Sequence, residues 1–201
     1  MKTDNGRGAK KAKVDIRRKA LDAVASARVF DGFCGTGQMW EAVWKDADAY
    51  TGCDTRQWSE REPYRRYVAD NKLVMRAIDL TQFNIFDFDA YGSPWDQMVI
   101  LAARRPWAAG EVGAVVLTDG SSMKLRYGSM SSSMSEILGV ERDSLPRSDA
   151  NSDALQAMLL TKWCKRAGVV AKNCWRAFGR GSGRGGQRMS YTALVFSGSS
   201  G

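Results

Sequence analysis

Asp31, Gly35 and Gly37 stand at a fixed spacing, Asp-x-x-x-Gly-x-Gly, between an apolar run and a helix-like stretch at 38–45. Glycine permits a tight turn from strand to helix and lets a ligand lie against the main chain, because it carries no side chain. The dinucleotide fingerprint Gly-x-Gly-x-x-Gly needs a third glycine, and Trp40 stands in that position. The segment therefore predicts a loop that binds a small molecule other than a dinucleotide, with an acidic residue before the glycines. The alternative interpretation is a strand–turn–helix corner that needs glycine only for its geometry.

This loop resembles motif I of class I S-adenosylmethionine (SAM)-dependent methyltransferases, in which the acid lies near the methionine end of the cofactor. Asp54 comes 23 residues after Asp31, close to the interval of about 20 residues expected for a carboxylate that grips a ribose hydroxyl. The resemblance implies that Asp54 holds the ribose of SAM and that Asp79, with the Leu80 backbone, meets the adenine amine. The expected cofactor-binding residues are Asp31, Gly32, Phe33, Cys34, Gly35, Gly37, Asp54, Asp79 and Leu80.

Acidic residues also end four successive apolar runs. They are Asp31, Asp54, Asp79 and Asp89, after the runs 28–30, 49–53, 73–78 and 83–88. A single aspartate at the end of a strand is ordinarily a turn former. Parallel strands, however, bring their carboxyl ends to one edge of the sheet, where ligands bind. Together with the glycine loop, the four predict a rim of carboxylates around the cofactor.

The segment Phe88 to Pro94 is the second chemical signal, and it resembles motif IV of amino-group methyltransferases, commonly Asp/Asn-Pro-Pro-Tyr. It is similar in particular to the Asp-Pro-Tyr/Phe-Gly-Ser-Pro form of the tRNA guanine-N2 methyltransferase family. The matching residues are Asp89, Tyr91, Gly92, Ser93, Pro94 and the later pair Thr118-Asp119. Ala90 replaces the family's first proline. The resemblance covers 27–119 by motif and the C-terminal hairpin by architecture.

The resemblance implies that Asp89, Ala90 and Tyr91 are the catalytic residues. An exocyclic base amine is a poor nucleophile because its lone pair is conjugated with the ring. The Asp89 carboxylate and the Ala90 carbonyl oxygen could accept its two hydrogens and aim the lone pair at the methyl group. Tyr91 could stack on a base that has left its helix. The alternative interpretation is a Tyr-Gly-Ser-Pro turn that only starts the next helix.

The chain of 201 residues contains no histidine, which excludes Ser-His-Asp and Cys-His catalysis and the usual histidine-containing zinc sites. We therefore expect no metal and a cofactor that carries its own leaving group, as SAM does. No apolar run is long enough to span a membrane, and the N-terminus lacks the apolar core of a signal peptide. Four cysteines without Cys-x-x-Cys spacing fit a reducing cytoplasm.

The elements that must position these residues alternate between strands and helices. Strands are expected at 28–31, 49–53, 73–78, 83–88, 112–117, 169–178 and 189–196, and helices at 14–26, 38–45, 95–107 and 150–166. This order predicts an α/β fold: a Rossmann-like, doubly wound, seven-stranded sheet, mostly parallel with a C-terminal antiparallel hairpin. We expect a flexible basic arm at 1–13, one domain at 14–196 with an insert at about 120–149, and a flexible tail at 197–201.

The formal charge of +8 suggests a polyanionic partner, and basic residues that could contact nucleic acid occur in two segments. Arg61, Arg65 and Arg66 alternate with tyrosines, a composition suited to phosphates and stacked bases. Arg180, Arg184 and Arg188 lie in or beside the glycine-rich turn of the hairpin. A solvated helix face and a mobile turn are the structural alternatives.

The sequence thus favours a SAM-dependent methyltransferase acting on an exocyclic amine of a nucleic-acid base, with RNA guanine-N2 slightly ahead of DNA adenine-N6 or cytosine-N4. Two alternatives stay open. The acceptor could be a protein or small-molecule amine, or the chain could be a catalytically weakened nucleic-acid-binding protein with a SAM fold, which Ala90 keeps possible. The target base, RNA versus DNA and the oligomeric state are not specified by these patterns.

Overall fold

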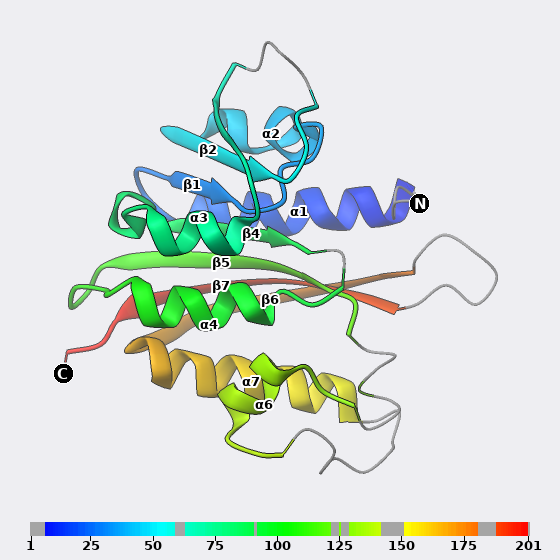
Figure 1. Cartoon of the computed structure of the whole chain (residues 1–201), viewed down its shortest axis with the longest axis vertical. Helices are drawn as coiled ribbons and strands as arrows, with labels where there is room; N and C mark the ends of the chain where they lie inside the picture. Colours follow the sequence, from blue (N-terminus) through cyan, green and yellow to red (C-terminus); the bar gives the residue numbers. More distant parts are fainter. Residues whose placement is uncertain are drawn as a thin grey trace.

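The computed structural model describes residues 7–58, 63–90, 92–121, 125, 129–141, 151–180 and 188–200. They contain a seven-stranded sheet in the order β3-β2-β1-β4-β5-β7-β6 (Figure 1). The strands are β1 (Arg28–Asp31), β2 (Ala49–Asp54), β3 (Arg65–Val68), β4 (Ile85–Asp89), β5 (Val112–Asp119), β6 (Val169–Arg180) and β7 (Arg188–Gly198). Strands β1 to β5 are mutually parallel, and β7 is antiparallel to β5 and β6. The predicted fold class is confirmed.

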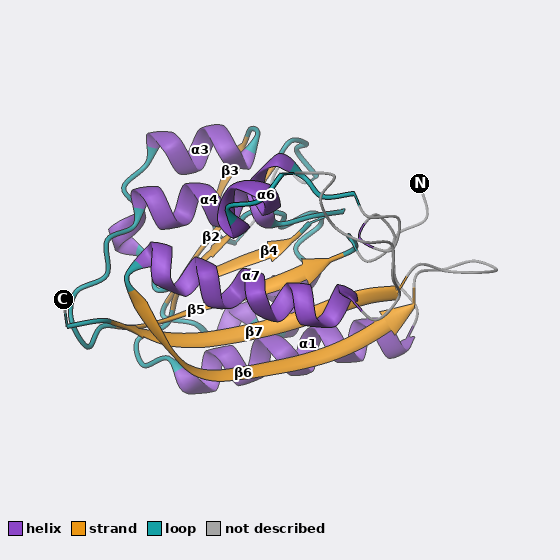
Figure 2. Cartoon of the chain, turned by 90° about the horizontal axis from the view of Figure 1, so that it is seen from below, coloured by secondary structure: helices purple, strands orange, loops and turns teal. Residues whose placement is uncertain are grey.

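Helices cover both faces of this sheet. They are α1 (Arg7–Ala23), α2 (Gln38–Ala42), α3 (Asn71–Ala77), α4 (Trp95–Arg104), α6 (Ser132–Leu138) and α7 (Asn151–Ala167), with 3-10 turns η1 (Trp44–Asp46) and η2 (Leu80–Gln82). Figure 2 shows α3, α4, α6 and α7 on one face and α1 on the other. Successive strand residues point to opposite faces, so in β4 Ile85 packs on the α1 side and Phe86 on the α4 side.

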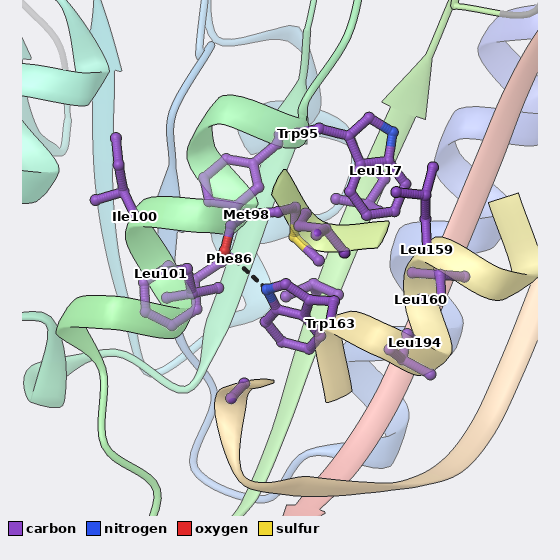
Figure 3. Close-up of a cluster of buried hydrophobic side chains, with 14 of the residues drawn as sticks. Phe86, Trp95, Met98, Ile100, Leu101, Leu117, Leu159, Leu160, Trp163 and Leu194 are labelled. Carbon is purple, nitrogen blue, oxygen red and sulfur yellow. Dashed lines mark hydrogen bonds between the residues drawn. The ribbon is translucent and has the colours of Figure 1, made fainter. Parts of the chain in front are cut away.

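The core under α4 and α7 is built around aromatic side chains. Trp163 of α7 is fully buried, and its ring nitrogen donates a hydrogen bond of 2.7 Å to the Met98 carbonyl of α4 (Figure 3). Its ring also contacts Phe196 of β7, with ring centroids 5.5 Å apart. A buried indole needs a partner for its N–H, so this bond fixes how α7 lies against α4.

The expectation of a flexible arm at 1–13 is wrong from residue 7 onward, because α1 begins at Arg7. The apolar side of this helix extends further toward the N-terminus than the strong signal from Ile16 onward. Ala9 is buried and Ala12 packs against the same core as Ile16 and Ala20. Small alanines among lysines form a weak apolar stripe in the sequence, but they allow the helix to lie close to β6 and β7.

The expected strand at 73–78 is also wrong: this segment is mostly α3, and the third strand is β3 at 65–68. Asp70 caps α3 by accepting a hydrogen bond from the Lys72 backbone N–H at 2.8 Å. Val74 is buried whereas Leu73 is 64% exposed, so the apolar run is a helix with one buried side. β3 has no apolar run because it is an edge strand with exposed or half-buried side chains.

The predicted flexible tail at 197–201 is wrong at its beginning. Ser197 and Gly198 are the last residues of β7. The Ser199 backbone N–H then donates a hydrogen bond of 2.9 Å to the Gly168 carbonyl, which joins the end of β7 to the turn before β6. Backbone pairing, which side-chain polarity does not reveal, thus extends the ordered hairpin.

Candidate active site

The sheet changes its direction of growth at β1, because β2 and β3 lie on one side of it and β4 and β5 on the other. In an open parallel sheet, ligands bind in the crevice at the carboxyl ends of the strands beside this switch point. Asp31 ends β1 and Asp89 ends β4, so these two acids flank the crevice. Asp54 ends β2 beside them. The structure therefore brings together three of the four aspartates predicted to form a rim.

The glycine loop between β1 and α2 needs glycine at the predicted positions. Gly35 and Gly37 have φ angles of 52° and 79°, a region that residues with a Cβ rarely adopt. A Cβ on Gly37 would lie 2.7 Å from the Tyr64 hydroxyl. The loop is attached to its neighbours by backbone hydrogen bonds, including Cys34 N–H to the Cys53 carbonyl at 3.0 Å. It is thus a fixed turn at the edge of the crevice.

Asp54 connects this loop to the end of β2. Its two carboxylate oxygens accept hydrogen bonds from the backbone N–H groups of Gly35, at 3.1 Å, and Arg56, at 2.9 Å. Arg66 donates to the Gly35 carbonyl at 2.7 Å and to the Arg56 carbonyl at 3.1 Å. Because a carboxylate oxygen has two lone pairs, Asp54 retains acceptor capacity for a ligand hydroxyl.

Asp31 is buried at the base of the glycine loop. It accepts hydrogen bonds from the Phe33 backbone N–H, at 3.0 Å, and from the Tyr50 hydroxyl, at 2.8 Å. Burial, and then repulsion from the Asp87 carboxylate, raise the pKa of Asp31 well above its ordinary value. A cation at this position would restore the ionised form.

The placement of Asp79 and Leu80 beside the cofactor is wrong. Asp79 follows α3 and caps η2, before β4 begins, so it lies at the opposite, amino edge of the sheet. Its exposed carboxylate accepts hydrogen bonds from Thr81, which lower its pKa. Leu80 is a core residue. The error follows from taking 73–78 for a strand, because a strand there would have ended at Asp79.

The residues that do follow β3 are Asp70 and Asn71, which the sequence analysis did not single out. The buried Asn71 amide donates to the Gly32 carbonyl of the glycine loop at 2.7 Å. Gln97 of α4 donates in turn to the Asn71 side-chain oxygen at 2.8 Å. The available signal was the helix cap: an aspartate directly before a helical stretch.

Asp89, the predicted catalytic acid, lies between β4 and the N-terminal helix. The Lys13 ammonium is 3.0 Å from both of its carboxylate oxygens, and the Arg17 guanidinium is 3.5 Å from Oδ2. Burial alone would raise the pKa of Asp89, but the charges of Arg17 and Lys13 outweigh it, so its pKa is lowered. Asp89 is therefore an anion at neutral pH.

A second, fully buried ion pair involves Asp87, two residues before Asp89 in β4. Arg17 has no exposed surface and donates two hydrogen bonds to Asp87, at 2.6 and 2.8 Å. The Trp44 ring nitrogen also donates to Asp87, at 2.8 Å. Asp87 and Asp89 together outweigh the effect of burial and raise the pKa of Arg17. The sequence analysis read 83–88 only as an apolar run and did not identify this pair.

The turn after Asp89 is closed by the backbone. The Ala90 carbonyl oxygen accepts a hydrogen bond of 3.0 Å from the Gly92 N–H, and the Gly92 carbonyl accepts one from Gly120 N–H, at 2.6 Å. This second bond joins the β4 turn to the turn after β5. Ala90 keeps one lone pair for another donor. Tyr91, the third predicted catalytic residue, lies outside the described residues.

Three hydroxyl groups near these two turns are buried. They belong to Ser93, Thr118 and Ser121. Thr118 is paired with Asp89 across β5 and β4. Asp119, the next residue, accepts hydrogen bonds from Trp95, from Gln156 and from the backbone and side chain of Ser121. Asp119 therefore joins β5 to α4 and α7, while the hydroxyls add polar groups near the acceptor side.

The predicted nucleic-acid residues have different surroundings. Arg65 is exposed on β3, with its guanidinium 5.1 Å from the Tyr67 ring centroid. Arg66 supports the glycine loop, as described above, so its expected phosphate role is not favoured. Arg180 and Arg188 face each other at the free end of the β6–β7 hairpin, although their side chains are outside the described part. Arg61 and Arg184 also lie outside it.

In the part of the chain that the structure describes, no three His, Cys, Asp or Glu side chains gather as potential metal ligands. None of the described helices combines the length and apolar character needed to cross a bilayer.

No protein-family model matches the chain, and no curated protein matches it. Solved structures do. The N-methyltransferase NodS from Bradyrhizobium japonicum WM9, in complex with S-adenosyl-L-homocysteine, is similar with a TM-score of 0.57 and 11% identity, over 96% of this chain and 89% of that one. A putative RNA methyltransferase, PH1948 from Pyrococcus horikoshii, has a TM-score of 0.55 and 11% identity, over 94% and 85%.

The [4+2]-cyclase SpnF is also similar, with a TM-score of 0.53 and 14% identity, over 97% of this chain and 83% of that one. At these identities the similarity establishes the fold and leaves the reaction to be argued from the site. The chain shares its fold with these three proteins.

Proposed function

We propose that this chain is a SAM-dependent methyltransferase that modifies an exocyclic amine of a nucleic-acid base. The observation that carries the proposal is Asp89: an ionised carboxylate at the carboxyl end of β4, directly across the switch point from the glycine loop. The cofactor and acceptor groups of a methyl transfer must meet at such a point. The similarity to NodS in complex with S-adenosyl-L-homocysteine supports the cofactor.

The residues of the crevice fit SAM. Asp54 retains lone pairs for the ribose hydroxyls, and the positive φ angles of Gly35 and Gly37 hold the turn of the loop beside it. Asp31 lies at the base of the loop, suited to the cationic methionine end. Asp70 replaces Asp79 as the strand-end acid on the adenine side. SAM supplies an activated methyl group with its own leaving group.

The chain's own residues would orient the acceptor. Because its pKa is lowered, Asp89 is a weak base and a constant hydrogen-bond acceptor, so its role is to hold the amine hydrogens and direct the nitrogen lone pair. The free lone pair of the Ala90 carbonyl can accept the second hydrogen. Tyr91 remains the residue proposed to stack on the base.

A nucleic-acid acceptor is supported by the net charge of +8 and by the position of the hairpin. Asp119, at the carboxyl end of β5, pairs with Ser190 of β7, and the hairpin continues beyond this pair to Arg180 and Arg188. Its basic end therefore extends past the edge that holds Asp89. Within this class, the motif at 89–94 favours RNA guanine-N2 over DNA adenine-N6 or cytosine-N4.

The test is methyl transfer from labelled SAM to separate pools of tRNA, ribosomal RNA, DNA and protein, followed by nucleoside analysis of the product. The parent protein should label a nucleic-acid pool at an exocyclic amine. The Asp89→Ala variant should bind SAM normally and lose about 10²-fold or more in transfer, because it lacks a positioned contact to the acceptor. Label found in protein alone would reject the nucleic-acid assignment.

The alternative is a SAM-fold protein that binds nucleic acid without modifying it. Two observations favour it: the Ala90 carbonyl already accepts the Gly92 N–H, and Lys13 already contacts both Asp89 oxygens. Binding of SAM and nucleic acid with no transfer to any pool would support this second function and overturn the first.

A further inference from the structure

The N-terminal helix contributes a cation to the acceptor side of the site. Lys13 precedes Asp89 by 76 residues, yet its ammonium lies 3.0 Å from both carboxylate oxygens. The helix packs against β6 and β7 through its apolar side, which fixes the height of Lys13 relative to the end of β4. α1 is therefore a candidate component of the active site as well as a cover for the sheet (Figure 1).

The surroundings of Lys13 differ from those of a surface lysine. Its side chain is 14% exposed, whereas that of Lys11, two residues earlier, is 78% exposed and pairs with Asp15 one turn along the helix. The Lys13 ammonium lies 5.8 Å from the Tyr191 ring centroid, and the Arg17 guanidinium donates to the Lys13 carbonyl at 3.0 Å. Withdrawing an ammonium from water is costly, so this placement needs the Asp89 contact to balance it.

We propose that Lys13 is a positioning residue for amine methylation: its ammonium fixes the orientation and the charge of Asp89. The expected effect of Lys13 on catalysis rests on the proposed function. Its expected effect on Asp89 rests only on the distances between the two side chains. A carboxylate offers about four lone-pair sites. Lys13 contacts both oxygens of Asp89 and Arg17 contacts Oδ2. An acceptor amine needs one further site on this carboxylate, because the Ala90 carbonyl is proposed to accept its second hydrogen.

The charged groups around Asp89 set the direction of the effect. Lys13 and Arg17 face it from α1, and Asp87 precedes it on the same side of β4. Asp31 of β1 lies close enough to Asp87 for the two carboxylates to repel each other, and the Tyr191 ring of β7 is adjacent to Lys13. Arg17 is already shared with Asp87. Without Lys13, burial and Asp87 act on Asp89 against this shared cation and the Thr118 hydroxyl, so Asp89 should take up a proton at higher pH.

The experiment compares three variants of the full chain. Lys13→Met removes the charge and keeps a long stem against Tyr191, and Lys13→Arg restores the charge. Lys19→Met is the matched control, because Lys19 lies on the same helix, 5.6 Å from the Trp175 ring centroid, and has no carboxylate partner in the described part of the chain. The titration of Asp89 is followed by NMR of protein labelled with ¹³C-carboxyl aspartate and assigned with Asp89→Asn. The pH profile of kcat is measured in parallel.

In Lys13→Met, the Asp89 titration and the acid limb of kcat should both move to higher pH, and kcat at the low-pH end should fall by about tenfold or more. SAM affinity should stay unchanged. Lys13→Arg should restore the parent profile and Lys19→Met should match it. An Asp89 titration at or above the ordinary value in the parent, or one unmoved in Lys13→Met, overturns the proposal. The titration needs no methyl transfer, so failure of the proposed function is separately visible as absent kcat in the parent.

Discussion

Asp54 and Asp79 differ in their position relative to the glycine loop, although both were expected to bind the cofactor. Asp54 contacts the Gly35 N–H, whereas Asp79 is exposed at the opposite edge. Asp54→Ala should weaken SAM binding by at least about tenfold, because hydrogen bonds to a charged group contribute about 1.5–3 kcal/mol each. Asp79→Ala, the same substitution at the other edge, should leave it unchanged. Calorimetry measures the SAM affinity of the two folded variants. Equal affinities in the two would reject the assignment of the SAM site to this crevice.

Asp31 should make the stability of the ligand-free protein depend on pH. Burial and Asp87 raise its folded-state pKa, so between the unfolded value and the raised value the folded protein holds a proton that the unfolded chain does not. The free energy of unfolding should therefore fall as pH rises through this window. Asp31→Asn, whose amide can still pair with Tyr50, should lose this part of the slope. Urea unfolding at a series of pH values measures it, and parallel curves for the two proteins would contradict the inference.

The cysteine thiols should differ in reactivity. Burial, and then the charge of Asp54, raise the pKa of Cys53 to about 12, and burial with Cys174 nearby raises that of Cys164 to about 11. Partial burial also raises the pKa of Cys174, but Cys174 is exposed, so it should react first with a thiol reagent at pH 8 because the reagent can reach it. Cys53 and Cys164 should react only after unfolding. Mass spectrometry of the labelled peptides identifies the order, and early labelling of Cys53 would contradict it.

Among the elements, α1 carries neighbouring arginines in opposite environments. Arg17 is buried against Asp87, whereas Arg18 pairs with Asp46 on the surface, where the two side chains are 39% and 46% exposed. Arg17→Met should destabilise the fold by about 3–5 kcal/mol, because it leaves a buried carboxylate unpaired. Arg18→Met should cost at most about 1 kcal/mol. Removing both charges of the buried pair, with Asp87→Leu, should recover much of the loss. Chemical denaturation measures each value, and equal effects at 17 and 18 would contradict the buried-pair account.

Element patterns that depend on burial were predictable, and those that depend on tertiary contacts were not. β4 and β5 are buried in the centre of the sheet, so their residues form apolar runs in the sequence. β3 is an edge strand whose half-exposed residues, Arg65 to Val68, resemble a basic surface segment. The sequence pattern therefore predicts the third strand in the apolar run that forms α3. For the same reason it indicates Asp79 as the acid after the third strand, where the structure has Asp70. Lys13 and Arg17 reach Asp89 and Asp87 only through the fold, and no local spacing encodes such contacts.

At the scale of the molecule, three segments far apart in the sequence meet at one edge of the sheet (Figures 1 and 2). They are the first turns of α1, the loops after β1, β2 and β4, and the end of the β6–β7 hairpin at which Arg180 pairs with Arg188. The parallel strands supply the cofactor side, and the antiparallel hairpin and α1 border the acceptor side. The opposite edge holds Asp79 and the start of β6. This asymmetry predicts where a polyanion should bind.

If phosphates contact the hairpin end, binding of a single-stranded RNA should weaken with salt, with a log–log slope of about 0.7 per contact. Replacing Arg180, Arg184 and Arg188 by Gln should flatten the slope by about 2, because three contacts are lost together. The matched control replaces three exposed lysines near the opposite edge, Lys162, Lys165 and Lys172. Both variants lower the formal charge from +8 by 3, to +5, so a change seen in both would reflect net charge alone. Fluorescence anisotropy between low and moderate salt measures the slopes. If only the hairpin variant has a flatter slope, the phosphates bind beside the edge that holds Asp89. If the hairpin variant keeps the parent slope, the RNA does not bind along the hairpin.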